Sequence, residues 1–308
     1  MSMSDRDGLI WMDGEMVPWR DAQTHVLTHT LHYGLGCFEG VRAYNTANGA
    51  AIFRLQAHTD RLFRSAHILN MKIPFSKEEV NEAQCKAVRE NNLDEAYLRP
   101  MVFFGSEGMG LRAENLKVHV IVAGWSWPAY MSPEAREQGI KVRTSSYTRH
   151  HVNITLCKAK ANGNYINSML ALNEAIACGC QEALLLDNEG YVAEGSGENI
   201  FIYRDGVLHT PELTSCLEGI TRHTILEFCK ELGIPVKERR ITRDEVYIAD
   251  EAFFTGTAAE VLPIRELDGR VIGAGKRGPL TEKLQSLYFD TVKGKIDSRM
   301  NWLTPVRG

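Results

Sequence analysis

Two lysines, a tyrosine and a glutamate lie close together in the middle of the chain. Lys158 and Lys160 stand just before a polar Asn-Gly-Asn turn, and Tyr165 opens an expected helix after it. Glu194 follows an expected hairpin and is itself followed by the glycine-rich loop 195–199. An amine, a phenol and a carboxylate in one pocket suit pyridoxal phosphate (PLP). A lysine can form a Schiff base with this cofactor, and a carboxylate can keep its pyridine nitrogen protonated.

A plainer interpretation of these residues stays open at this point. Most lysines are solvated surface groups. A glycine-rich loop that contains a glutamate is usually no more than the turn of a hairpin. The choice between the two interpretations therefore depends on the rest of the chain.

Composition and charge restrict the class of protein. The 308 residues are 44% hydrophobic and 24% charged, which is typical of a globular protein with a full core. The net charge of −4 disfavours nucleic acid and anionic membranes as partners. The seven cysteines form no C-x-x-C pair, and the chain has neither a secretory signal nor an apolar run long enough to span a membrane. We therefore expect a cytoplasmic protein.

Turn and helix signals alternate along the chain and predict mixed α and β structure. Asp-Gly or Asn-Gly pairs at 13–14, 48–49 and 268–269 predict β-hairpins. An apolar stripe predicts a helix over 55–69, and Ser76 with Glu79 forms the capping box of a second helix. Hairpins are too frequent for a doubly wound parallel sheet, so the expected fold class is α+β in two layers.

A proline-containing segment divides the chain into two expected domains. Residues 125–138 include Pro128 and Pro133 and precede an alternating strand that begins at Ile140. We expect a smaller N-terminal α/β domain over 1–130 and an inter-domain loop over 131–139. A larger C-terminal domain over 140–308 is expected to carry the candidate lysine.

Two stretches of small residues could hold a phosphate group. The chain has no P-loop and no dinucleotide-binding glycine motif in a strand-to-helix context. Gly219, Ile220 and Thr221 begin an expected helix, where free N–H groups favour an anion. The turn 256–258 offers a hydroxyl and unobstructed N–H groups. Each signal is weak alone. No metal is expected, because no third ligand follows His29 and His32 at useful spacing.

Seven motifs in order identify a family resemblance that covers about Leu9 to Leu303. They are HTLHYGLGCFEGVRAY (29–44), HTDRLFRSA (58–66), YLRP (97–100), KANGNYINS (160–168), EGSGENIF (194–201), LEGITR (217–222) and FFTGTAAEV (253–261). The chain resembles the fold-type IV PLP enzymes, and within them the bacterial branched-chain amino acid aminotransferases. The resemblance implies the two-domain fold of D-amino acid aminotransferase, with the cofactor between the domains.

The resemblance implies a role for each matched residue near PLP. Lys160 would bond the cofactor and shuttle protons, whereas Lys158 matches no family position. Glu194 would face the pyridine nitrogen and Tyr165 the phenolic oxygen of the ring. The phosphate would be bound by the following residues: Arg61, Gly219, Ile220, Thr221, Gly256 and Thr257. Glu198 and Asn199 would shape the loop that follows Glu194.

The substrate residues follow from the same resemblance. Tyr97 and the N–H groups of Thr257 and Ala258 would hold the α-carboxylate. Arg42 is a further expected substrate contact, and Arg99 would grip the γ-carboxylate of glutamate. An apolar pocket for a branched side chain would be lined by Tyr33, Phe38, Leu111, Trp127, Tyr130 and Tyr165. Asn162 and Trp125 depart from the family pattern and leave the preference among leucine, isoleucine and valine open.

The resemblance implies a reversible amino transfer between branched-chain L-amino acids and 2-oxoglutarate with ping-pong kinetics. It also implies a homo-oligomer, a dimer or a dimer-based hexamer, with amino acids and 2-oxo acids as its small-molecule partners. Within the family, D-amino acid aminotransferase, (R)-amine transaminase and aminodeoxychorismate lyase remain alternatives, because few side chains set specificity in this fold. Outside it, a non-catalytic binding protein is disfavoured by the retained lysine, tyrosine and glutamate.

Overall fold

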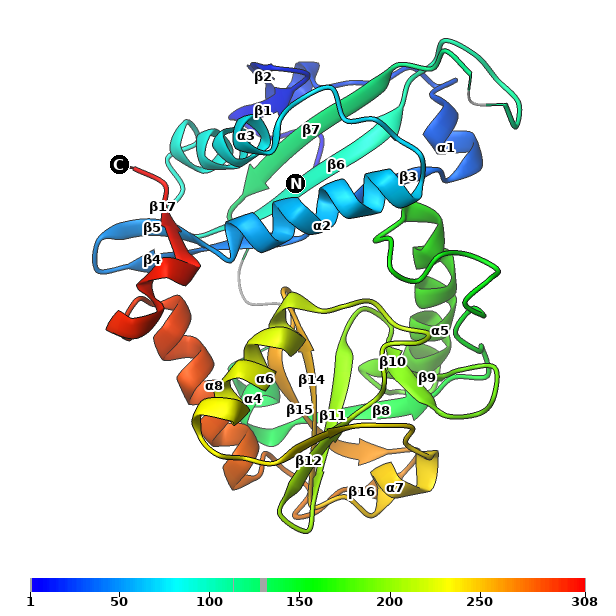
Figure 1. The fold of residues 1–308 in the computed structure, drawn as a ribbon, viewed down its shortest axis with the longest axis vertical. Coiled ribbons are helices and arrows are strands. Elements are labelled where there is room, and N and C mark those ends of the chain that lie inside the picture. The colour runs from blue at the N-terminus through cyan, green and yellow to red at the C-terminus, as the bar shows by residue number, and fades with distance from the viewer. Residues whose placement is uncertain (1, 113, 128–131, 308) are drawn as a thin grey trace. The chain divides into compact units, whose positions relative to one another are not determined.

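The computed structural model describes residues 2–112, 114–127 and 132–307 and divides into two compact units. The first unit comprises Met1–Pro128, Ala159–Gly163 and Thr291–Gly308, and the second comprises Ala129–Lys158 and Asn164–Asp290. Both units combine a sheet with helices (Figure 1). The expectation of mixed α and β structure with frequent hairpins is therefore confirmed.

An eight-stranded sheet forms the centre of the first unit, in the order β17-β5-β4-β6-β7-β1-β2 with β3 paired to β6. Its strands are β1 (Leu9–Met12), β2 (Glu15–Pro18), β3 (Gly36–Phe38), β4 (Val41–Thr46), β5 (Gly49–Phe53), β6 (Ala96–Phe104), β7 (Val118–Trp125) and β17 (Leu303–Pro305). All these pairs are antiparallel. The Asp-Gly turn between β1 and β2 has positive φ at both residues, as a tight hairpin requires.

Helices α2 (Leu55–Ile68) and α3 (Lys77–Arg89) lie across this sheet (Figure 1), and α1 (His29–Tyr33) is a short helix before β3. The N–H of Glu79 donates to the Ser76 hydroxyl at 3.1 Å and the N–H of Ser76 to the Glu79 carboxylate at 2.7 Å, which confirms the capping box at the start of α3. The apolar face of α2 is buried against the sheet through Leu62 and Ala66. Two 3₁₀ turns, Trp19–Asp21 and Asp297–Trp302, complete this unit.

The second unit contains a nine-stranded sheet in the order β10-β9-β8-β15-β14-β11-β12-β13, with β16 paired to β15. Its strands are β8 (Ile140–Thr144), β9 (Glu182–Leu186), β10 (Val192–Gly195), β11 (Asn199–Arg204), β12 (Val207–Thr210), β13 (Val236–Glu238), β14 (Glu251–Gly256), β15 (Glu260–Leu267) and β16 (Arg270–Val271). Its helices are α4 (Pro133–Gln138), α5 (Tyr165–Ala177), α6 (Ile220–Glu231), α7 (Arg243–Tyr247) and α8 (Pro279–Val292), and a 3₁₀ turn over Asn162–Asn164 precedes α5. Strand β8 is parallel to both of its neighbours, so this sheet is mixed.

The structure differs from the expected domain organisation in three places. The expected loop 131–139 contains helix α4, because the Ser132 hydroxyl caps it by accepting from the N–H of Ala135 and Pro133 occupies its first turn. Residues 159–163 join the first unit, where Ala161 bridges to Cys37. The C-terminal segment joins it as well, because β17 pairs with β5. Lys160 thus belongs to the first unit and not to the larger C-terminal part of the chain.

In the part of the chain that the structure describes, no helix combines the length and the hydropathy needed to cross a bilayer. The same residues contain no group of three or more histidine, cysteine, aspartate or glutamate side chains able to hold a metal ion.

Candidate functional site

Lys160 is held from both sides by the first unit. Its N–H donates to the Ser65 hydroxyl on α2 at 3.0 Å, and its carbonyl accepts from the N–H of Phe38 at 3.1 Å. Its ammonium lies 5.2 Å from the centre of the Phe38 ring. The backbone of Lys160 is fixed between helix α2 and strand β3. The position from which its side chain extends is therefore determined by the packing of the first unit. A fixed amine is what covalent catalysis by lysine needs.

Four predicted substrate residues share one face of the first sheet. Tyr97 and Arg99 are two residues apart on β6 and therefore point to the same side. Arg42 is the register partner of Tyr97, and Phe38 is the partner of Met101, two residues further along β6. The Arg99 guanidinium lies 4.6 Å from the centre of the Phe38 ring. The sheet thus places a cation beside an aromatic ring at the predicted pocket.

Aromatic side chains surround Tyr97. Its ring centre lies 4.5 Å from that of Trp127 and 5.4 Å from that of Trp125. Gly40 leaves room for the tyrosine, since a Cβ there would overlap the Tyr97 hydroxyl. A glycine is required at position 40 because of this close approach. Tyr97 and Trp127, both predicted substrate residues, therefore lie side by side, and Trp125, which departs from the family pattern, belongs to the same cluster.

Two other predicted pocket residues are not enclosed by their own unit. Leu111 is 90% exposed and Tyr33 is 42% exposed. Both are tied to the loop 105–112, because the Gly110 N–H donates to the Tyr33 hydroxyl at 3.2 Å and the Gly110 carbonyl contacts His29 Nε2 at 2.8 Å. Tyr130, the remaining predicted aromatic residue of the pocket, lies outside the described residues.

The second unit holds Glu194 at the end of β10, beside a buried cation. Arg149 Nε lies 2.8 Å from Glu194 Oε1, and both side chains are buried. The N–H of Leu217 donates to Glu194 Oε2 at 3.3 Å. An arginine beside a buried carboxylate favours its anionic form, which is the form needed opposite a protonated pyridine nitrogen. Sequence reasoning missed Arg149, because it belongs to none of the seven motifs.

Tyr165 and Lys158 take different positions in the second unit. Tyr165 is the first residue of α5 and is half-buried. The Lys158 ammonium donates to the backbone carbonyl of Leu213 and lies 3.4 Å from that of Cys216. Its amine is therefore occupied by carbonyl groups, which supports the prediction that Lys158 is not the reactive lysine.

Three segments that carry predicted phosphate and loop residues meet in the second unit. Helix α6 begins at Ile220 without a side-chain cap, and Thr221 in its first turn is buried. Asn199 packs against Gly219, donates to the Leu217 carbonyl at 3.0 Å and pairs with Thr255 next to Gly256. Uncapped N–H groups at the start of a helix favour an anion, so this arrangement fits a phosphate group.

A buried carboxyl pair supports the loop after Glu194. Glu182 Oε1 accepts from the N–H of Ala183 at 2.7 Å and of Ser196 at 3.3 Å, and Glu182 is hydrogen-bonded to Glu198. Burial raises the pKa of Glu182. The hydrogen bond with Glu198 opposes this effect and lowers the pKa of Glu182. The Cγ of Glu198 lies close to Gly256. This contact agrees with the loop-shaping role expected for Glu198.

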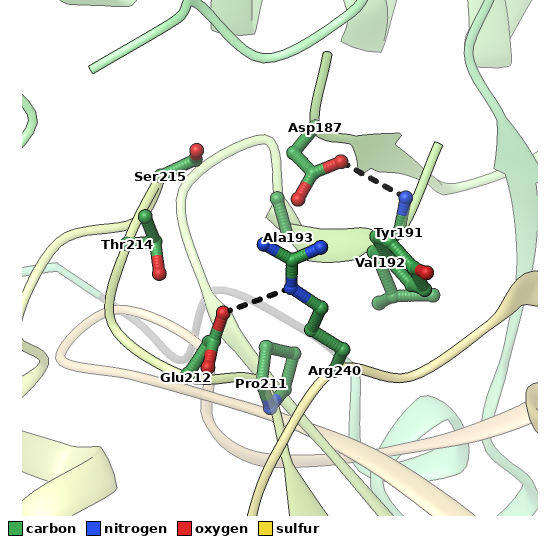
Figure 2. Close-up of a pocket in the computed structure, with 9 residues that line it drawn as sticks. All are labelled: Asp187, Tyr191, Val192, Ala193, Pro211, Glu212, Thr214, Ser215 and Arg240. Carbon is green, nitrogen blue, oxygen red and sulfur yellow. Dashed lines mark hydrogen bonds and ion pairs between the residues drawn. The ribbon is translucent and has the colours of Figure 1, made fainter. Parts of the chain in front are cut away.

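A small hollow in the second unit contains none of the predicted site residues. Figure 2 shows its lining, with the Arg240 guanidinium pointing across it. Arg240 is paired with Glu212 at 3.2 Å and with Glu189 at 2.7 Å, so its charge is already balanced. The hollow has room for about one water molecule. It offers no site for an anionic cofactor.

Comparison with known proteins decides the family. The family model Amino-transferase class IV matches residues 36–267. The chain belongs to the class IV aminotransferases. The sequence of this class IV aminotransferase is 72% identical, over the full length of both chains, to the branched-chain-amino-acid aminotransferase of Pseudomonas aeruginosa. The resemblance found in the seven motifs is thereby confirmed.

Solved structures agree with this assignment. The T.th. branched-chain amino acid aminotransferase with pyridoxamine 5'-phosphate matches this class IV aminotransferase with a TM-score of 0.96 at 48% identity, covering 98% of this chain and 99% of that one. The same protein has been solved with N-(5'-phosphopyridoxyl)-L-glutamate and with 4-methylvaleric acid, and both structures match with a TM-score of 0.94 at 98% and 99% coverage. Their identities to this chain are 48% and 47%.

The residues present fit PLP, the cofactor of class IV aminotransferases. The first unit supplies a fixed lysine amine and the guanidinium of Arg61. The second supplies a buried carboxylate beside Arg149 and the uncapped start of α6. These are the donor types that an aldehyde, a phosphate and a pyridine nitrogen require.

Proposed function

We propose that this class IV aminotransferase is a branched-chain amino acid transaminase. It transfers the amino group reversibly between L-leucine, L-isoleucine or L-valine and 2-oxoglutarate. The observation that carries this proposal is the shared face of β6, where the Phe38 ring lies against the Arg99 guanidinium. An aromatic wall suits a branched apolar side chain, and a guanidinium suits the second carboxylate of glutamate. The T.th. relative, solved with a glutamate adduct and with 4-methylvaleric acid, supports one enzyme for both substrate types.

The roles proposed for the chain's own residues follow from their positions. Bound PLP supplies an aldehyde that condenses with amines and a ring that accepts the electron pair left at the substrate Cα. Lys160 Nζ would bond the aldehyde in the resting protein and would move the proton at the substrate Cα. Glu194 would keep the ring nitrogen protonated, and the Tyr165 hydroxyl would face the phenolic oxygen of the ring. Arg61 and the first turn of α6 bind the phosphate.

The substrate roles remain those of the sequence analysis. Tyr97 and the N–H groups of Thr257 and Ala258 hold the α-carboxylate. Arg99 binds the γ-carboxylate of glutamate or 2-oxoglutarate. Because the amino donor would leave as a 2-oxo acid before the second 2-oxo acid accepts the amino group, the kinetics should be ping-pong.

An absorption spectrum of the purified protein tests the proposal. We expect a visible Schiff-base band that L-glutamate bleaches and 4-methyl-2-oxopentanoate restores, because each ligand runs one half-reaction. A band that glutamate leaves unchanged, but D-leucine or an amine bleaches, would instead indicate a D-amino acid or (R)-amine transaminase. No band after addition of PLP would refute the cofactor and the enzyme activity together.

We also propose that the protein is at least a dimer. The proposal is supported by the apolar face of α5, where Ile166, Met169 and Leu170 are 64%, 63% and 43% exposed. Contiguous exposed apolar side chains typically mark an interaction surface. Leu111 is also exposed, although it is predicted to line a pocket.

Sedimentation equilibrium should give a mass of at least twice 34.6 kDa. Met169→Glu should shift that mass toward the monomer, and a wild-type monomer would contradict the proposal.

A cytoplasmic location is proposed from the state of the cysteines. All seven are free thiols, and five of them are buried. Free thiols persist in a reducing compartment. Fractionation of cells that produce the protein would test this location, and recovery from an oxidising compartment would contradict it.

A further inference from the structure

One buried face of α2 carries three polar side chains. His58, Arg61 and Ser65 follow one another at spacings of three and four residues, so they lie on the same side of the helix. Their exposed fractions are 2%, 4% and 0%. Polar groups this deeply buried need partners, because leaving them unsatisfied costs free energy. Their partners identify what this face of the helix holds in place.

Glu39 is the common partner of His58 and Arg61. Arg61 Nε donates to Glu39 Oε1 at 2.7 Å, and Arg61 Nη2 donates to Glu39 Oε2 at 2.8 Å. His58 Nδ1 lies 2.7 Å from Glu39 Oε2. The backbone N–H of Glu39 donates to the Pro100 carbonyl at 2.8 Å, which fixes the carboxylate to strand β6. One fully buried carboxylate therefore fixes two donors of the Arg61 guanidinium, Nε and Nη2.

The charge states of this trio are set by burial and by the arginine. Burial raises the pKa of Glu39, but Arg61 and the hydrogen bonds outweigh this effect and lower that pKa to about 2. Burial also lowers the pKa of His58, so its imidazole is neutral near pH 7 and donates its Nδ1–H to the carboxylate. A buried ion pair is weak evidence for a gain in stability, because desolvation offsets the attraction. Orientation is the clearer effect, since a guanidinium held by two parallel hydrogen bonds cannot turn in its plane.

The same two segments also hold the predicted reactive lysine. Ser65, one turn after Arg61 on α2, accepts the N–H of Lys160 at 3.0 Å. Phe38, directly before Glu39, donates to the Lys160 carbonyl at 3.1 Å. The positions of the Arg61 guanidinium and the Lys160 backbone are thus fixed by one helix face and one strand end. A cofactor held at its aldehyde and at its phosphate requires a constant separation between these two anchors.

We propose that Glu39 and His58 are positioning residues that orient Arg61 for the phosphate group of the cofactor. The inference rests on the proposed function, which assigns Arg61 to that phosphate. Glu39 fixes the plane of the Arg61 guanidinium, and His58 fixes the carboxylate of Glu39. Neither residue was singled out by sequence reasoning, although Glu39 lies within HTLHYGLGCFEGVRAY and His58 within HTDRLFRSA.

Titration of the full-length, cofactor-free protein with PLP and with pyridoxal, which lacks the phosphate, tests this proposal. Glu39→Gln should raise the Kd for PLP by about 10-fold to 100-fold, the range found for groups that orient metal-ligating side chains in the same way. The Kd for pyridoxal should change by no more than about twofold, because pyridoxal does not use Arg61. Glu251→Gln is the matched control. Glu251 is a buried carboxylate that accepts the N–H groups of Leu280 and Thr281 and the hydroxyl of Thr281, and neither of these described partners is a predicted site residue.

The two ligands separate positioning from other roles. If Glu39 only lowered the positive charge of Arg61, Glu39→Gln would tighten the binding of PLP, which would overturn the proposal. If Glu39 had only a structural role, Glu39→Gln would raise the Kd values for PLP and pyridoxal together. Alternatively, it would leave both Kd values unchanged and lower the melting temperature, as in Glu251→Gln. Either outcome would also overturn the proposal. His58→Asn leaves the Arg61–Glu39 pair in place and should raise the Kd for PLP selectively by about threefold to tenfold. This variant decides the matter if Glu39→Gln does not fold. A wild-type protein that binds no PLP would contradict the proposed function itself.

Discussion

Lys160→Ala should abolish transamination, whereas Lys158→Ala should retain most of it. Loss of Lys160 should lower kcat by more than about 10⁴-fold, because no other group can both bond the cofactor and move the Cα proton. Lys158 binds the backbone carbonyls of Leu213 and Cys216, so its loss should cost about 1 kcal/mol of stability and little catalysis. Steady-state assays with L-leucine and 2-oxoglutarate measure both variants.

The Lys160 and Lys158 variants control for each other, because the two lysines are two residues apart and belong to different units. Lys160→Ala should also lack the Schiff-base band, while Lys158→Ala should keep it and melt at a slightly lower temperature. Comparable activity in the two variants would refute the assignment of the reactive lysine.

Arg99→Ala should lose glutamate and 2-oxoglutarate far more than leucine. Removing a cation that is paired with a substrate carboxylate costs about 3 kcal/mol, or about 100-fold in kcat/KM. The apolar side chain of leucine has no carboxylate for Arg99 to bind, so its kcat/KM should fall by less than about fivefold. Half-reaction rates, followed in the absorption spectrum with each amino acid alone, separate the two substrates.

Arg99→Lys is the matched control for this prediction. It keeps the positive charge but not the planar pair of donors, and should recover part of the activity toward glutamate. The Arg99 guanidinium also packs against the Phe38 ring, so its removal disturbs packing as well. Equal losses for glutamate and leucine in Arg99→Ala would show that Arg99 acts by packing and not by binding the carboxylate.

Local signals in the sequence determined much of the secondary structure. The hairpin at Asp13 and Gly14 and the capping box at Ser76 and Glu79 are set by residues within a few positions of each other. Local backbone preferences are sufficient for such features, because the partners of each hydrogen bond are close in sequence. Order and identity of the motifs were likewise enough to predict the family and its cofactor.

The assignment of segments to units needed the tertiary structure. A composition shift near residue 130 indicated a boundary but not that the chain returns to the first unit at Ala159–Gly163 and again at Thr291. The return at Lys160 depends on bonds to Ser65 and Phe38, which are 95 and 122 residues away in sequence. No local pattern encodes contacts at such separations, because they depend on how the whole core packs.

By itself, the sequence determined the family, the cofactor and the residue types that carry the chemistry, because motifs retain the order of their residues along the chain. Only the tertiary structure paired Arg61 with Glu39 and Glu194 with Arg149. Those pairs join residues from different elements in the interior, where a charge is stable only beside its partner. Which carboxylate meets which guanidinium is decided by packing, and so the residues that orient the site became visible only in the fold.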